Sequence, residues 1–407
     1  MSTVTTKELK SLIADPQAEG QLYDEMCALR GRFTPELAAS VQTNLTREEA
    51  VARAVDALHA IQHLILDGKD VREGDAGHGL GHWTRDYMHA LYLAHDPEIE
   101  PRFALPGILG GTLHDIGTLF LDRYADKGRA FRHAEAAALL VRTAGLETGV
   151  LTESEADLAA WVIAAHTHYL RSSVVECADG VSREVSPYAD THDGQPILAV
   201  WLPRWADRLD CSGPCMVGRH YLTLAKDHDD YGQHGFYKVS FGEALRPLLR
   251  TQDEIKAAGG SQTMLEHMRM FAASQSNDSP YGKHDHGRMT RQRDAYRASL
   301  EHIIAQVARP TDVDVERIIL AWTGFLSTIE PTLKPELALT LEENFRQLES
   351  GTQRAWACGF RATMTEYLVW GDRISSFLQG IPEAYWEFPG VKGGLMGLTT
   401  DTSLMEY

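Results

Sequence analysis

The sequence predicts an all-α fold in which a helical core carries additional helices on its N- and C-terminal sides. Apolar residues recur mostly every three or four positions, the spacing that lines one face of an α-helix. Thr46 is followed three residues later by Glu49, a spacing that caps a helix start, and the same spacing recurs after Thr152. Strand patterns are rare, and residues 235–241 form a single short alternating run.

The first core helices follow from these patterns in chain order. After Thr46, an apolar stripe continues until Asp67 interrupts it. A second helix over about 82–95 places its aromatic residues on one side. Residues 106–121 are nearly all apolar or small, so the third helix is expected to be buried on most sides.

The following segments continue the helical pattern with one interruption. Helices are expected over about 132–144 and from Thr152 to near His168. Residues 177–196 are rich in Gly, Pro, Asp and Ser, which predicts a loop, and helical spacing resumes over about 197–212. Further amphipathic stretches are expected at about 242–257, 261–275, 287–307, 312–328, 335–349 and 352–379.

Length and composition limit the classes of function. The chain has 407 residues, of which 43% are hydrophobic, and this suits a globular protein of about two to three domains. We expect an N-terminal helical segment over 1–70, a metal-binding core over 71–220 and a C-terminal helical region of unknown role over 221–407. The formal charge of −18 argues against an extended nucleic-acid surface and against binding to anionic membranes. A small anionic substrate stays compatible with this charge, because metals or a few basic residues can reverse the sign inside one pocket.

Targeting and redox features point to the cytoplasm. No segment reaches the length of an apolar membrane span, and the first residues lack the apolar core of a signal peptide. Five scattered cysteines do not form a disulfide framework. A cytoplasmic protein is therefore expected, and a homo-oligomer is compatible with the sequence.

One ordered set of histidines and aspartates stands out among the 18 histidines of the chain. Its members lie on different predicted helices, apart from one adjacent His-Asp pair. Neutral imidazoles and carboxylates are the usual ligands of Mn, Fe, Co, Ni and Zn, and four imidazoles with two carboxylates suit two metals that share a bridge. The set consists of His82, His114, Asp115, His133, His166 and Asp207.

In this order the residues resemble the HD-domain superfamily of metal-dependent phosphohydrolases, over about residues 78–212. The local contexts fit as well: GHWTRDYMHALYLA, LGGTLHDIGTLF, RHAEAAALLV, IAAHTHY and WADRLD. The resemblance implies a helical HD-domain core with a binuclear metal centre. By this resemblance the first metal is held by His82, His114, Asp115 and Asp207, and the second by the bridging Asp115 with His133 and His166.

The chain departs from the family pattern at one position that bears on substrate binding. Many members carry a lysine three residues after the aspartate of the His-Asp pair, and this chain has Thr118 there. Lys127 and Arg129 follow shortly afterwards and are expected to supply the missing positive charge.

Three further residues complete the expected site. Arg85 lies one turn after the first histidine of the set, where it either reaches an anion or pairs with a neighbouring acid. His78 approaches the same region through a glycine-rich stretch, and His168 follows the last histidine of the set. Either His78 or His168 is expected to protonate the leaving oxygen, with Asp115 as the catalytic carboxylate.

Three functions are compatible with this set of residues. The first is a phosphohydrolase, in which a metal-activated hydroxide attacks the phosphorus of a nucleotide or another small phosphate ester. The second is a di-iron oxygenase, because an oxygenase branch of the superfamily, similar to myo-inositol oxygenase and the phosphonate-cleaving oxygenases, shares the ligand set. Its substrate would be a small polyol or a phosphonate-like compound. The third is a non-catalytic ligand-sensing protein, against which the intact ligand set argues. The ligand count does not decide between hydrolase and oxygenase.

Overall fold

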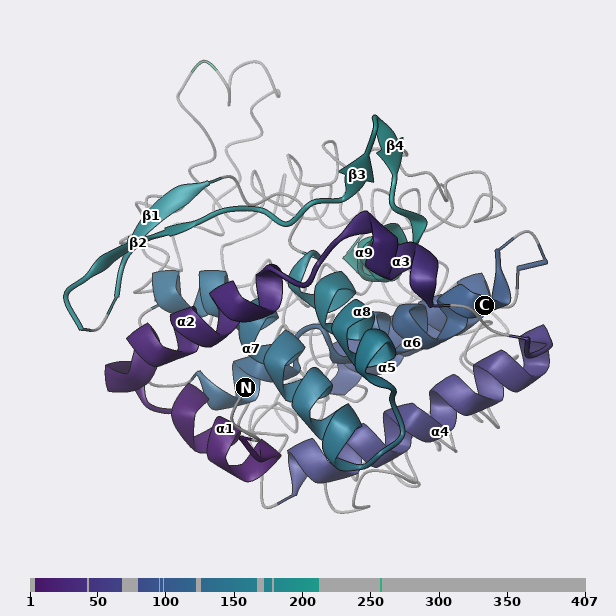
Figure 1. The fold of residues 1–407 in the computed structure, drawn as a ribbon, viewed down its shortest axis with the longest axis horizontal. Helices are drawn as coiled ribbons and strands as arrows, with labels where there is room; N and C mark the ends of the chain where they lie inside the picture. Colours follow the sequence, from purple (N-terminus) through teal and green to yellow (C-terminus); the bar gives the residue numbers. More distant parts are fainter. Residues whose placement is uncertain are drawn as a thin grey trace, which may run out of the picture.

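The structure is a computed structural model that describes residues 4–41, 44–67, 80–94, 96–97, 99–121, 126–166, 172–177, 179–211 and Ala257. This part of the chain is mostly helical, as the sequence predicts (Figure 1). The helices expected beyond residue 220, the alternating run 235–241 and both expected domain boundaries lie outside the described residues. Within the described residues, no helix combines the length and the apolar composition needed to cross a membrane.

The α-helices of the described residues are separated by turns, by short 3-10 helices and, before the last helix, by two strand pairs. A 3-10 helix, η4 (Ile116–Phe120), comes directly after the sixth of them. The α-helices are α1 (Thr6–Ile13), α2 (Glu19–Arg30), α3 (Pro35–Ser40), α4 (Arg47–Leu66), α5 (Leu80–Ala94), α6 (Ala104–Leu113), α7 (Asp126–Glu147), α8 (Glu153–Ala164) and α9 (Leu198–Cys211).

Two helix starts have the capping contacts that the sequence predicts. The backbone N–H of Glu49 donates to the hydroxyl of Thr46 over 3.3 Å, and the carboxylate of Glu49 accepts from the Thr46 N–H over 2.8 Å. The same reciprocal pair forms between Thr152 and Glu155 at the start of α8. These contacts satisfy backbone donors that have no partner inside the helix, so α4 and α8 begin where predicted.

Helix α6 lies at the centre of the core and packs against α4, α5, α8 and α9. All ten of its residues are buried, which confirms the expectation from its apolar sequence. Its glycines let neighbouring helices come close: a Cβ at Gly110 would lie 2.6 Å from Cγ of Pro203 on α9. This close approach brings the middle of α9 against α6, next to the end of α6 that carries the His-Asp pair.

The predicted helix over 106–121 is not continuous. Helix α6 ends at Leu113, and η4 begins at Ile116 after a two-residue turn. Successive residues of an α-helix are turned by about 100° from one another, so two adjacent side chains do not normally face one point. The change of helix type at His114 and Asp115 lets both side chains enter the same cluster, and their Nε2 and Oδ2 atoms are 3.4 Å apart.

Gly117 of η4 lies against α7 and carries the first prediction. A Cβ at this position would lie 2.3 Å from the carbonyl oxygen of His133 and 2.8 Å from the backbone nitrogen of Ala137. Backbone atoms cannot rotate away, so we expect Gly117→Ala to lower the free energy of unfolding by about 1–3 kcal/mol. Urea denaturation measures this change. Gly31→Ala is the matched control, because the nearest atom to its added Cβ lies at 3.6 Å, and equal effects of the two substitutions would contradict the predicted steric clash.

Short strands lie in the segment 177–196, which was predicted as a loop, and just before it, within a chain that is otherwise mostly helical as predicted. Strand β1 (Ser173–Glu176) pairs antiparallel with β2 (Ser182–Val185), and β3 (Thr191–His192) pairs with β4 (Gln195–Pro196). The strands are four and two residues long, so turn residues such as Gly180 and Gly194, both at positive φ, dominate the composition of the segment. Figure 1 shows the β1–β2 hairpin beside α2, where Arg30 donates to the carbonyl oxygens of Ser186 and Pro187.

Candidate metal centre

Histidine and aspartate side chains from α5 to α9 meet in the interior of the helical core. All six ligands predicted from the sequence belong to this cluster, and five of them are buried, while Asp207 is partly exposed. Helix α5 supplies His82 and Asp86, the end of α6 supplies His114 and Asp115, α7 supplies His133, the residues after α8 supply His166, and α9 supplies Asp207.

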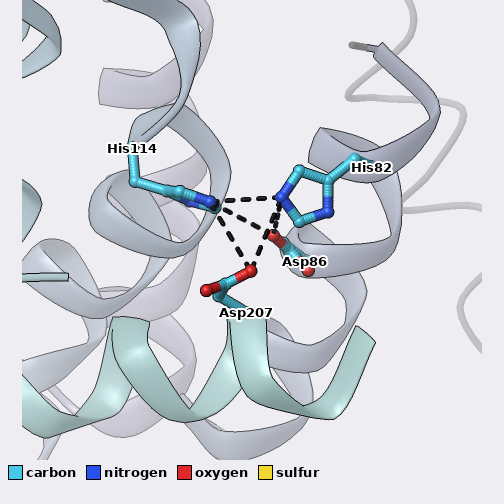
Figure 2. Close-up of side chains that lie close together, drawn as sticks. All are labelled: His82, Asp86, His114 and Asp207. Carbon is cyan, nitrogen blue, oxygen red and sulfur yellow. Dashed lines mark hydrogen bonds and ion pairs between the residues drawn. The ribbon is translucent and has the colours of Figure 1, made fainter. Parts of the chain in front are cut away.

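The first group of candidate ligands gathers around Nε2 of His82 and Nε2 of His114, which are 3.2 Å apart (Figure 2). Oδ2 of Asp86 lies 3.0 and 3.6 Å from these two nitrogens, and Oδ2 of Asp115 lies 3.2 and 3.4 Å from them. Oδ1 of Asp207 completes the group at 3.6 and 3.9 Å. We call the space between these five atoms the first position.

The second group of candidate ligands uses the other oxygen of Asp115. Oδ1 of Asp115 lies 3.4 Å from Nε2 of His133 and 3.6 Å from Nε2 of His166. The two imidazole nitrogens are themselves 3.2 Å apart. We call the space between these three atoms the second position. Asp115 therefore lies between two positions, with one carboxylate oxygen facing each.

Three of the four imidazoles are held through Nδ1, which leaves Nε2 for a metal. His114 donates from Nδ1 to the carbonyl oxygen of Gly111 over 3.0 Å, and His166 donates from Nδ1 to that of Ile163 over 2.7 Å. Nδ1 of His82 lies 2.8 Å from Oδ2 of the buried Asp210. Since carbonyl and carboxylate oxygens only accept, these contacts place a proton on Nδ1, and each neutral imidazole then has its lone pair on Nε2.

The electrostatics of the cluster favour a bound cation. Lone pairs that face one another across 3.2 Å repel unless a proton or a metal lies between them. Burial acts to lower the pKa of His114, but the carboxylates of Asp115, Asp207 and Asp86 outweigh it and raise the pKa to about 10. The metal-free cluster therefore attracts positive charge strongly.

The donor set also fits transition metals in its dimensions. Adjacent ligands of a six-coordinate metal at about 2.1 Å lie roughly 3.0 Å apart, and opposite ligands lie roughly 4.2 Å apart. The nitrogen–oxygen distances of the first group, 3.0 to 3.9 Å, fall within this range. The donor atoms of His114, Asp115 and His166 also lie within 4.8 Å of one another, so the two positions are adjacent. Imidazole and carboxylate donors suit Fe, Mn, Co, Ni or Zn.

Two residues of the centre escaped the sequence analysis. Asp86 stands one helical turn after His82 on α5, and its i,i+4 spacing is the signal that could have revealed it. Asp210 is the last residue but one of α9, and its carboxylate contacts Nδ1 of His82 on the side away from the first position. A lone aspartate next to an arginine or at a helix end usually belongs to the surface, so neither residue stood out.

The remaining predicted site residues are only partly placed. Arg85 lies on α5, and Lys127 and Arg129 lie on the first turn of α7, but their side chains are outside the described part of the structure. His78 and His168 fall outside the described residues altogether. The substrate and proton-transfer roles of these five residues therefore stay predictions.

Thr118 stands where many HD-domain proteins have a lysine, and here it takes a structural role. It is buried, and its hydroxyl donates to the backbone carbonyl oxygen of Asp115 over 2.8 Å. This bond holds the turn that carries the His-Asp pair. Thr118 therefore supplies no positive charge to the centre.

Asp210 carries the second prediction, because it orients His82 without belonging to the first position. We expect Asp210→Ala to weaken metal binding at the first position by about 10–100-fold, since the imidazole loses its partner at Nδ1. Titration of metal-free protein with Mn²⁺ measures the change. Asp210→Asn is the matched control: its amide oxygen still accepts from Nδ1, so a smaller loss is expected. Unchanged affinity in Asp210→Ala would contradict the orienting role.

A cavity of about 490 Å³ lies apart from the centre, between α1, α2 and α7. Five leucines line it, together with charged residues that include Arg32, Arg142 and Glu153. Both arginines pair with Asp157 over 2.6 Å and also with Glu153, so two carboxylates balance their charge. None of the lining residues belongs to the His/Asp cluster, and the cluster is the better candidate for chemistry.

Comparisons of the chain with protein families, with curated proteins and with solved structures found no match. Within the described residues, the helical fold and the buried cluster of possible metal ligands are compatible with an HD-domain protein. Function is therefore inferred from the geometry of the centre.

Proposed function

We propose that this protein is a metal-dependent phosphohydrolase of the HD-domain type, which acts on a nucleotide or another small phosphate ester. The observation that carries the proposal is the place of Asp115, whose two carboxylate oxygens face two different pairs of imidazole nitrogens. A carboxylate shared by two adjacent metal positions is typical of enzymes that activate water for attack on phosphorus.

The residues of the centre would hold two divalent cations of Fe, Mn, Co, Ni or Zn. Such cations supply Lewis acidity and lower the pKa of water toward neutrality. Asp86, Asp115 and Asp207 bring three negative charges and Asp210 adds a fourth behind His82, and two bound divalent cations would neutralise all four. The metals would therefore remove the repulsion that an anionic substrate otherwise meets in an acidic protein.

The protein keeps this geometry fixed through its backbone. The carbonyl oxygens of Gly111 and Ile163 hold the rings of His114 and His166 from behind, and both carbonyls belong to helices of the buried core. Ligands that do not need to reorient when charge develops on the phosphate stabilise the transition state more effectively. Arg85, Lys127 and Arg129 are proposed to bind the phosphate oxygens, and His168 or His78 to protonate the leaving oxygen.

A phosphatase assay tests the proposal directly. Metal-free protein supplied with Mn²⁺, Co²⁺, Ni²⁺ or Fe²⁺ is expected to hydrolyse at least one member of a panel of phosphate monoesters and diesters. Asp115→Asn, purified in parallel, is the matched control, because it keeps the shape of the side chain and removes its charge. Equal activity of this variant would identify a contaminating phosphatase.

The same preparation distinguishes the other functions. An oxygenase purified with Fe²⁺ in the absence of oxygen would consume dioxygen when a small polyol or a phosphonate is added, and would leave phosphate esters intact. That result would contradict the proposed hydrolase function and support the oxygenase function. If neither assay detects activity, the result would contradict an enzymatic function and favour a ligand-sensing role.

A further inference from the structure

The two positions of the centre differ in the number of donors that the described residues provide. Five atoms surround the first position: two imidazole nitrogens and three carboxylate oxygens. Three atoms surround the second position: two imidazole nitrogens and one oxygen of Asp115. Asp115 is shared, so the difference comes from Asp86 and Asp207.

Asp86 is placed like a ligand of the first position. Its Oδ2 lies 3.0 Å from Nε2 of His82 and 3.6 Å from Nε2 of His114. The equivalent distances for Oδ2 of Asp115 are 3.2 and 3.4 Å, so the two oxygens approach the same pair of nitrogens equally closely. Figure 2 shows the Asp86 carboxylate pointing from α5 into the space between the two imidazole rings.

The placement of Asp86 follows from helix geometry. Residues four apart on an α-helix lie on the same face, so His82 and Asp86 reach one point from consecutive turns of α5. Asp86 is completely buried, and a carboxylate in this environment interacts strongly with a cation because little water screens the charge. Asp207 approaches the same point from α9, with Oδ1 3.6 Å from Nε2 of His82.

The charge of the two positions differs in the same direction as the number of donors. Carboxylate oxygens of Asp86, Asp115 and Asp207 face the first position, whereas one oxygen of Asp115 faces the second. Asp210 adds a fourth acid behind His82, which makes that imidazole a stronger donor. Among the described residues, a divalent cation therefore finds more ligands and more opposite charge at the first position.

We propose that Asp86 is a fifth protein ligand of the first position, and that it makes the two positions unequal. The first position binds its divalent cation first and tightly, and the second position binds a cation later and exchanges it readily. This inference rests on the metal centre of the proposed function but not on the reaction that the centre performs.

Titration of the metal-free full chain with Mn²⁺ tests the inference, with calorimetry for the affinities and electron paramagnetic resonance for the count of bound ions. Two classes of site are expected, separated by about a hundredfold or more in affinity. Asp86→Asn is expected to weaken the tight class by at least about tenfold, because it removes a charged ligand but keeps the side-chain volume. His133→Ala is the matched control and is expected to lose the weak class while keeping the tight one.

Each outcome decides the question. Two sites of equal affinity, or an unchanged tight site in Asp86→Asn, would overturn the inference. If Asp86→Asn fails to fold, His133→Ala still distinguishes the classes, and Asp86→Glu is expected to retain a tight site because it restores the carboxylate. Unequal sites in a protein without phosphatase activity would contradict the proposed function alone, and equal sites in an active phosphatase would contradict the inference alone.

Discussion

Asp115→Ala is expected to remove both bound metals and to lower activity by about a thousandfold or more, while the helical content is largely retained. The reason is that Oδ2 of Asp115 contacts the first group of ligands and Oδ1 contacts the second. Water cannot replace a bridging carboxylate, because it restores neither the charge nor the fixed geometry. Elemental analysis of the purified variant measures metal content, and far-ultraviolet circular dichroism measures helical content.

The control for this experiment is Asp157→Ala, which removes another buried carboxylate at a distance from the centre. Asp157 accepts hydrogen bonds from Arg32 and Arg142, each over 2.6 Å. We expect this variant to lose stability and to keep its metals. An Asp115→Ala protein that still carries two metals per chain would exclude the bridging role.

Arg132→Met is expected to lower the free energy of unfolding by about 3–5 kcal/mol. Arg132 is completely buried, and its guanidinium donates to Glu19 over 3.1 Å and to Glu135 over 2.9 Å. Burial acts to lower the pKa of Arg132, but the Glu135 carboxylate and the hydrogen bonds to Cys177 and Glu19 raise it overall, so the group stays charged. Its loss leaves two buried carboxylates without their cation.

Two comparisons make the Arg132 prediction specific. Arg102→Met removes an arginine whose partner Glu100 is largely exposed, and it is expected to change stability by about 0–1 kcal/mol. The triple variant Arg132→Met, Glu19→Gln, Glu135→Gln is expected to recover much of the lost stability, because no buried charge remains unpaired. Urea denaturation measures all three variants. If the single and triple variants are equally unstable, the cost does not come from uncompensated charge.

The sequence carries most of the information about the metal ligands, because six polar residues of metal-binding type recur on apolar helices. It carries less about neighbours that only the packing reveals. In the sequence alone, Asp86 is interpreted as an ion-pair partner of Arg85. The packing of α5 against α6 and α9 shows that Asp86 faces the histidine cluster. The role of Asp210 likewise depends on its contact with His82, which lies far away in the sequence.

Element boundaries show the same division between local and long-range information. The start of α8 is encoded locally by Thr152 and Glu155 and was predicted correctly. Its end was placed near His168, but α8 ends at Ala164, and His166 follows in a turn where its Nε2 reaches Asp115. The break between α6 and η4 could not be predicted from the apolar stretch itself. It places His114 and Asp115 in a cluster with residues of other helices, and those contacts are long-range.

The contact between His82 and Asp210 joins residues 128 positions apart, and this separation orders the assembly of the centre in time. A ribosome releases α5, α6, α7 and α8 before α9, so Asp207 and Asp210 are the last members of the cluster to be synthesised. A nascent chain that has not yet docked α9 presents the second group complete and the first group without Asp207. A cation held at the first position would link Asp207 of α9 to α5 and α6, and would thereby close a long loop of chain.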